Sequence, residues 1–357
     1  MASLTLPDVT LNYQLIGNVP ETGPDGTAGA GPVPVMMVHG LGANLSFWFL
    51  GALRHLGRDR AFLLSDLRGH GASSMPGAGY TLDTLADDML AVMDAAGVTS
   101  AHLVGHSHGG RVAMVMAQRA PDRFASLTVA DTQLRALQPP MRLRDWPHWP
   151  VWKRELQSEG VTNFPPEEAE IDFRMLAALG PRGRIPAAGG APGAMRGQAP
   201  DQGRGAGRRI KRAGAAQGTG KGINLRSRQM GARSAQRWDT LMSETAAKAD
   251  MDDESAVDIP ALSALNMPVL LVYGAQSHCV PTSEALLTRI PGARRILVPG
   301  AGHFFPIVKP RRFALALQAF LAGVDTPGRA ARRRDAARRN RGAARPVQRR
   351  IFRTRNT

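Results

Sequence analysis

A six-residue segment, GHSHGG at positions 105–110, constrains the fold of this chain more than any other feature. It follows a short apolar run at 101–104 and opens a helical pattern over 111–119. A Gly-x-Ser-x-Gly between a strand and a helix is typical of a tight turn that holds the serine side chain out over the sheet edge. Gly105 and Gly109 supply the small residues that such a turn requires. The segment therefore predicts a strand–turn–helix unit that exposes a serine hydroxyl.

Three further segments occur in the order and at the distances that the same arrangement requires. They are VPVMMVHGLG at 33–42, DLRGHGAS at 66–73 and GAGHFFP at 300–306. Together with the first segment they resemble the α/β-hydrolase family. Segment 33–42 resembles the family's buried strand and oxyanion loop, 66–73 resembles the turn after its next strand, and 300–306 resembles the loop that carries its catalytic histidine. The resemblance implies an α/β fold, with a doubly wound, mostly parallel sheet and an inserted cap region.

The spacing of the apolar runs predicts the same architecture. Short runs of the kind found in strands buried on both faces lie at 33–38, 61–65, 101–104, 126–130, 269–273 and 295–298. Helical patterns lie at 47–56, 81–96, 111–119, 282–290 and 310–322. We expect residues 4–9 and 10–16 to form an antiparallel leading pair of strands. Strands that alternate with helices imply right-handed crossovers and a doubly wound sheet.

The 357 residues are enough for one α/β domain with an insertion. We expect the core to comprise 1–132 and 257–322, the cap 133–256, and a basic tail 323–357. In the cap, WPHWPVW at 146–152 holds three of the five tryptophans. Packing of the cap onto the core explains this cluster better than the lining of an apolar substrate pocket, because aromatic residues dominate packing generally.

The formal charge of +16 comes from two stretches of the chain. Residues 181–235 contain 12 Lys and Arg against one acidic residue, and residues 323–357 contain 12 against two, so the remainder carries −5. This distribution argues against nucleic acid as a partner of the core. Since 181–235 also has 13 glycines and no aromatic residue, we expect disorder there and in the tail. A natural basic linker and tail, and out-of-frame reading of a GC-rich gene, both remain open explanations.

The resemblance implies acyl transfer to Ser107. A serine hydroxyl needs a base within hydrogen-bond reach to accept its proton, and His303 is the candidate. The backbone N–H groups of Leu41, after Gly40, and of His108 are expected to hold the developing oxyanion. Each such donor typically lowers the barrier by about 3 kcal/mol.

The acid of the triad is where the sequence departs from the family pattern. The usual aspartate lies in a Gly-x-x-Asp turn, and the corresponding segment 274–281, GAQSHCVP, contains no carboxylate. Some family members place the acid after the preceding strand, where Asp131 follows the run 127–130. We therefore expect Asp131 to orient His303. Two alternatives stay open: that His303 has no carboxylate partner, or that Asp131 only stabilises its loop.

Other histidines receive no catalytic role from the sequence. His39 is expected to brace its loop and His70 to be structural, while His106 and His108 are explained equally by substrate contact and by packing. No role is assigned to the three residues Asp66, His278 and Cys279. No set of ligand-type residues shows metal-binding spacing, so we expect neither metal nor cofactor.

A single cysteine excludes an internal disulfide framework. The amino terminus lacks the pattern of a signal peptide, and no apolar run approaches the roughly 18 residues of a membrane span. We therefore expect a cytoplasmic protein with no membrane contact, and leave its oligomeric state open.

The function favoured by these residues is hydrolysis of a small-molecule carboxylic ester or thioester through an acyl-serine. A carbon–carbon hydrolase or an acyltransferase would use the same residues. The alternative from another class is a catalytically impaired binding protein whose basic segments contact acidic partners.

Overall fold

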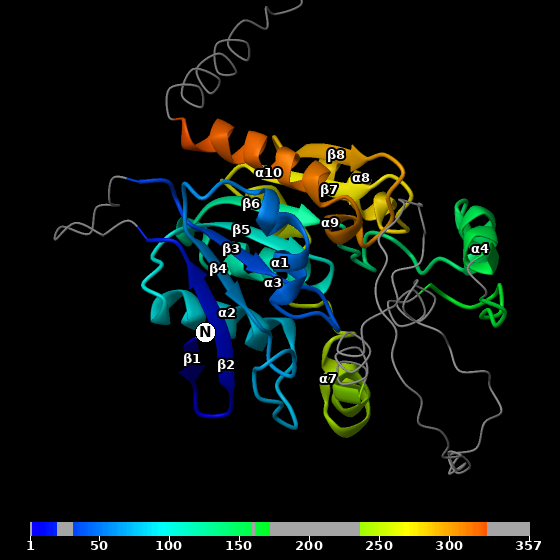
Figure 1. Cartoon of the computed structure of the whole chain (residues 1–357), viewed down its shortest axis with the longest axis horizontal. Coiled ribbons are helices and arrows are strands. Elements are labelled where there is room, and N and C mark those ends of the chain that lie inside the picture. The colour runs from blue at the N-terminus through cyan, green and yellow to red at the C-terminus, as the bar shows by residue number, and fades with distance from the viewer. Residues whose placement is uncertain (1, 20–30, 159–160, 172–235, 327–357) are drawn as a thin grey trace, which may run out of the picture. The chain divides into compact units, whose positions relative to one another are not determined.

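The computed structural model describes residues 2–19, 31–158, 161–171 and 236–326 (Figure 1). The chain divides into two compact units, one formed by 1–139 with 238–357 and the other by 140–237. The first unit thus takes in residues at both ends of the expected cap, and the limits of the cap remain a prediction. The expected disordered stretch 181–235 and nearly all of the basic tail lie outside the described residues.

One eight-stranded sheet organises the first unit, in the order β1-β2-β4-β3-β5-β6-β7-β8. Its strands are β1 (Ala2–Thr5), β2 (Thr10–Ile16), β3 (Val35–Val38), β4 (Phe62–Ser65), β5 (Ala101–His106), β6 (Phe124–Ala130), β7 (Val269–Gly274) and β8 (Arg294–Val298). The pairs β1–β2 and β2–β4 are antiparallel, and all the other neighbouring strands pair in parallel. The predicted fold class, a doubly wound and mostly parallel sheet, is confirmed.

Helices cover both faces of the sheet. They are α1 (Ser46–Leu50), α2 (Leu82–Ala95), α3 (His108–Arg119), α8 (Val280–Arg289), α9 (Phe305–Val308) and α10 (Pro310–Asp325). A further helix, α7 (Ala247–Asp250), and the helical residues 236–244 contribute to a separate small cluster around Tyr80. Short 3-10 helices are η1 (Ala52–His55), η2 (Pro121–Arg123) and η4 (Pro260–Ala264). None of the helices in the described part of the chain combines the length and hydropathy needed to cross a bilayer.

The alternation of side chains along the strands divides the core into two layers. In β3, Met36 and Val38 pack with the apolar faces of α2, α3 and α8. Val35 and Met37 point to the other face, where they pack with α1, α9 and α10. Because both faces are covered, the central strands are apolar at successive positions, which made them recognisable in the sequence.

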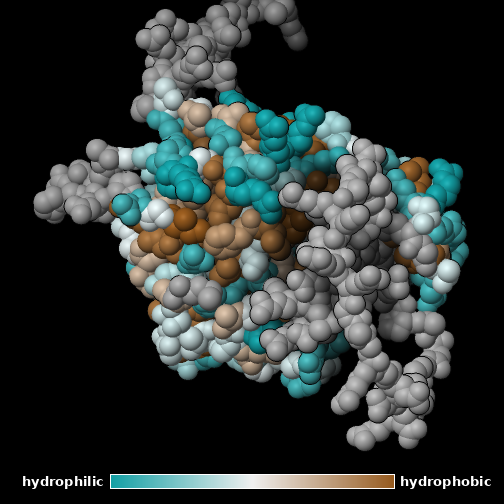
Figure 2. Space-filling model, viewed as in Figure 1, coloured by the Kyte–Doolittle hydropathy of each residue, from teal (hydrophilic) through white to brown (hydrophobic). Residues whose placement is uncertain are grey.

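The outer surface of this second layer is partly apolar. In Figure 2, apolar surface gathers around the place that α1 has in Figure 1, below α10. Leu50, Val308 and Leu315 are its most exposed large apolar side chains, each more than half exposed.

Two elements differ from the sequence-based prediction. The leading strand was expected at residues 4–9, but β1 spans Ala2–Thr5 and the following residues form the turn into β2, closed by a 2.8 Å hydrogen bond from Leu6 N to Val9 O. The helix expected at 47–56 is interrupted at Gly51, where ψ is −118°. A Cβ there would lie 2.6 Å from the carbonyl oxygen of Pro306. The chain therefore changes direction at Gly51, because a residue without a Cβ is needed for this close approach.

The described part of the second unit has its own small core. It contains η3 (Leu143–Asp145) and α4 (Trp149–Ser158). The ring of Trp152 packs edge-on against Trp146 and Trp149, with centroids 5.7 Å and 5.9 Å apart. These tryptophans thus pack against one another inside the unit.

Candidate active site

Ser107 lies at the apex of a strained turn between β5 and α3. Its φ of 55° and ψ of −123° are rare for a residue with a side chain, and such strain persists only where the surroundings enforce it. Its N–H donates to Ala130 O at 2.9 Å, and its carbonyl accepts from Gly110 N at 2.9 Å and from the Thr132 hydroxyl at 3.0 Å. The backbone is therefore fixed while the residue stays accessible in part, between buried and exposed.

The glycines beside Ser107 are required by close backbone contacts. A Cβ on Gly105 would overlap the carbonyl of Gly109, and a Cβ on Gly109 would overlap the carbonyl oxygens of Val38 and His39. A Cβ on Gly40 would lie 3.0 Å from Ser107 Cβ. The loop after β3 thus presses directly against the serine turn.

The structure brings Ser107, His303 and Asp131 into one chain of hydrogen bonds. Ser107 Oγ lies 3.0 Å from His303 Nε2, and His303 Nδ1 lies 3.0 Å from Asp131 Oδ1. The three residues come from the carboxyl ends of β5 and β6 and from the loop between β8 and α9. In an open α/β sheet this edge is where ligand-binding groups gather.

Asp131 is a buried carboxylate with three donors. It accepts from His303, from the Ser277 hydroxyl and, at 2.6 Å, from Gly274 N. Burial alone would raise its pKa, but these hydrogen bonds favour the ionised form and lower the pKa below the ordinary value. In the structure the His303 ring thus has a carboxylate within hydrogen-bond distance, as the prediction of Asp131 requires.

The predicted oxyanion donors lie on the two segments that meet at Ser107. His108 is the first residue of α3, so its backbone N–H has no acceptor within the helix. Leu41 follows Gly40 in the loop after β3. The His39 ring spans that loop: Nδ1–H donates to Gly40 O at 2.8 Å, and Nε2 accepts from Leu67 N at 3.1 Å. Burial lowers the pKa of His39, which favours the neutral ring that this pattern needs.

His106 supports the histidine loop. Its Nε2 lies 3.0 Å from the carbonyl oxygen of His303, and its ring stacks on Phe47 with centroids 4.7 Å apart. Burial, with a smaller contribution from the neighbouring His303, lowers its pKa to about 3. A neutral Nε2–H therefore donates to the loop, and packing rather than substrate contact explains this residue.

Asp66 holds the loops around the site, a role that the sequence did not reveal. Its carboxylate accepts from Leu45 N at 2.7 Å, and from Asn12 Nδ2 and Ala72 N at 2.8 Å each. It thereby ties the segment that follows the oxyanion loop to the first half of the sheet.

The turn between β7 and α8 supplies contacts that sequence reasoning missed. Ser277 occupies the fourth position of the Gly-x-x-Asp pattern, and its hydroxyl donates to Asp131. Cys279 Sγ lies 3.7 Å from His303 Nδ1 and 3.4 Å from His278 Nε2. The only sequence signal for these contacts was the missing carboxylate, because it leaves a serine at the position where the family pattern has an aspartate.

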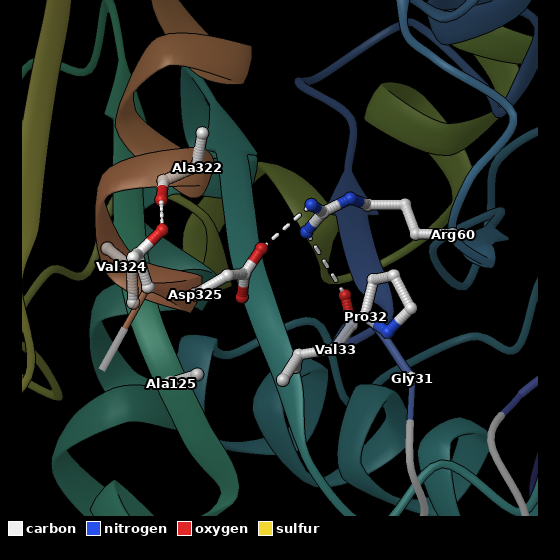
Figure 3. Close-up of a pocket in the computed structure, with 9 residues that line it drawn as sticks. Gly31, Pro32, Val33, Arg60, Ala125, Ala322, Val324 and Asp325 are labelled. Atoms are coloured by element: carbon white, nitrogen blue, oxygen red, sulfur yellow. Dashed lines mark hydrogen bonds and ion pairs between the residues drawn. The ribbon is translucent and has the colours of Figure 1, made fainter. Parts of the chain in front are cut away.

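A cavity of about 610 Å³ lies at the opposite edge of the sheet, next to the amino ends of β3 and β6 (Figure 3). Arg60 and Asp325 point toward each other there, 2.8 Å apart, and Asp325 also lies 3.0 Å from His102 Nε2. These groups tie the end of α10 to the sheet, and the cavity contains none of the predicted site residues.

Comparisons with known proteins agree with the fold. Residues 33–166 match the family model for the alpha/beta hydrolase fold. The chain is 39% identical over 101 residues to the dihydrolipoyllysine-residue acetyltransferase component of the acetoin cleaving system of Pseudomonas putida, over 28% of this chain and 27% of that protein. It is 33% identical over 131 residues to 3-oxoadipate enol-lactonase 2 of Acinetobacter baylyi, over 36% and 44%. The chain thus spans less than half the length of these curated relatives.

The solved structure of a hydrolase from Pseudomonas aeruginosa PA01 superposes with a TM-score of 0.53 at 24% identity, over 90% of this chain and 97% of that chain. Residues 33–166 thus match the α/β-hydrolase family model, and the chain has the α/β-hydrolase fold.

Proposed function

We propose that this protein is a serine hydrolase that cleaves a small-molecule carboxylic ester or thioester through a covalent acyl-serine. The observation that carries the proposal is the continuous chain of two 3.0 Å hydrogen bonds from Ser107 through His303 to Asp131. A strained serine, a base and a buried carboxylate in this order are the parts that nucleophilic catalysis requires.

In the first half-reaction Ser107 Oγ attacks the substrate carbonyl carbon while His303 Nε2 accepts the hydroxyl proton. The N–H groups of Leu41 and His108 hold the negative oxygen of the tetrahedral intermediate. When the intermediate collapses, His303 returns the proton to the leaving alcohol or thiol. Water then attacks the acyl-serine by the same proton transfers and releases the acid.

Asp131 positions His303 and compensates its charge. Because Nδ1–H donates to the carboxylate, the lone pair of the neutral ring lies on Nε2, where Ser107 needs it. The low pKa of Asp131 keeps the carboxylate ionised when His303 becomes an imidazolium.

The relatives support attack on an activated carbonyl and leave the final acceptor open. One is named an enol-lactonase, and a lactone is a cyclic ester; the other is named an acetyltransferase component. Hydrolysis is preferred here because nothing beyond water is needed to complete it. Acyl transfer and carbon–carbon bond hydrolysis on the same three residues are the competing reactions, and a product analysis separates them.

The test is hydrolysis of a series of p-nitrophenyl esters of increasing acyl length, together with labelling by a fluorophosphonate. Ser107→Ala should abolish labelling and lower kcat by about 10⁴–10⁶-fold, because the nucleophile is lost. Ser263→Ala, which removes an exposed hydroxyl in η4, is the matched control and should keep both properties.

The proposal would be overturned if the wild-type protein neither reacted with the fluorophosphonate nor hydrolysed any of the esters. If such protein instead bound nucleic acid with a steep salt dependence, the basic segments would define its function, as the binding-protein alternative requires.

Fractionation of cells tests the predicted cytoplasmic location.

A further inference from the structure

His278, Cys279 and His303 form a compact group of metal-ligand atoms beside the proposed triad. One ring nitrogen of each histidine and the Cys279 sulfur all lie within 4.8 Å of one another. All three residues are buried, with Cys279 at 0% exposure. The group joins the turn before α8 to the loop before α9, two segments that are 24 residues apart in the chain.

The two sulfur–nitrogen separations within this group match those of a tetrahedral zinc site. Zinc binds sulfur at about 2.3 Å and imidazole nitrogen at about 2.05 Å, so a tetrahedral angle places the two ligand atoms about 3.6 Å apart. Cys279 Sγ lies 3.4 Å from His278 Nε2 and 3.7 Å from His303 Nδ1. A cation can therefore reach these atoms with little movement of the backbone.

The carboxylate nearest to the group also suits a cation. Asp131 Oδ1 lies 3.0 Å from the same His303 nitrogen, and the Asp131 side chain is fully buried. A divalent ion would be neutralised by this carboxylate and by the thiolate of Cys279, which offsets the cost of its burial. A mixed sulfur and nitrogen set of this kind favours zinc and similar thiophilic metals over magnesium or calcium.

We propose that His278, Cys279 and His303 form an inhibitory binding site for a thiophilic divalent cation such as Zn²⁺. The inference rests on the proposed function, because it assigns a regulator to the same histidine. On binding, Cys279 releases its thiol proton to solvent and coordinates as the thiolate. The His303 proton moves from Nδ1 to Nε2, so that Nδ1 can donate its lone pair to the metal.

This change of tautomer stops the reaction. Nε2 carries a proton in the metal-bound form and no longer accepts the proton of Ser107. The hydrogen bond from Nδ1 to Asp131 is lost at the same time. The metal therefore removes the base from the triad without occupying the position of the substrate carbonyl.

The test compares ester hydrolysis by chelator-treated, desalted protein across a Zn²⁺ titration. Wild type should be inhibited, and Cys279→Ser should need at least about tenfold more Zn²⁺ for half-inhibition, each measured against its own metal-free rate. His55→Ala removes an exposed histidine of η1 and should inhibit like wild type. Equal inhibition of the wild type and Cys279→Ser would show adventitious zinc only and would overturn the proposal.

A second measurement is independent of activity. Co²⁺ added to the metal-free protein should give a thiolate-to-cobalt charge-transfer band, which belongs to Cys279 because the chain has one cysteine. The band should disappear in Cys279→Ser, and its absence from the wild type would refute the site. Metal-free protein that neither hydrolyses esters nor reacts with fluorophosphonate contradicts the proposed function instead, and the band still reports on the metal site.

Discussion

At the scale of single residues, the proposed triad takes its acid from the end of β6, the strand next to β7. Asp131 follows β6, while Ser277 occupies the position of the family's usual aspartate after β7. The two side chains contact each other, and Asp131 also contacts His303. The Ser277 hydroxyl and the His303 ring thus contact the same oxygen of Asp131.

This arrangement predicts that the acid can be transferred. Asp131→Asn should lower kcat by about 10³–10⁴-fold, because an amide no longer selects the required tautomer of His303. Adding Ser277→Asp to that variant should restore part of the activity, since the new carboxylate would stand beside the position of the lost one. Ester hydrolysis measures both effects, with Asp122→Asn, at an exposed position in η2, as the control. Unchanged turnover in Asp131→Asn would assign Asp131 to loop stability alone.

At the scale of elements, Gly51 sets the contact between α1 and α9. Gly51→Ala would place a methyl group 2.6 Å from Pro306 O and 2.9 Å from Phe47 O, both backbone atoms that cannot rotate away. We expect a loss of about 1–3 kcal/mol in the free energy of unfolding, the usual cost of overpacking. Urea denaturation measures it, and Gly77→Ala, where a Cβ meets nothing within 4 Å, is the control. Equal stability of the two variants would mean that α9 shifts freely.

Elements of this kind show what the sequence could and could not predict. The central strands were located from apolar runs, because a strand buried on both faces has few alternatives. The break at Gly51 was missed because its cause, the carbonyl of Pro306, lies some 250 residues further along the chain. Asp131 was predicted from its place after a strand, whereas the contacts of Ser277 and Cys279 depend on how two loops meet. Such contacts leave no periodic pattern in a sequence.

At the scale of the whole molecule, buried histidines make stability depend on pH. Burial lowers the pKa of His106 and of His278 to about 3, and it also lowers the pKa values of His39 and His108. In the unfolded chain these rings titrate near 6.5. Below that pH the unfolded state therefore binds more protons than the folded state.

The free energy of unfolding therefore decreases as the pH falls. Each ring contributes to the free energy of unfolding, and this contribution is fully present above about pH 6.5. It decreases as the pH falls toward the pKa of the ring in the folded state, by about 1 kcal/mol between pH 7 and pH 5.5. His106 and His278 together should thus cost about 2 kcal/mol over that interval, and His39 and His108 should add to it. Urea denaturation at the two pH values measures the loss, and His106→Asn should reduce it because one titrating ring is removed. His55→Ala, which removes an exposed ring of η1, is the control. If the free energy of unfolding were equal at pH 7 and pH 5.5, these rings would accept protons in the folded protein. The assignment of a neutral His106 that donates to the carbonyl oxygen of His303 would then be wrong.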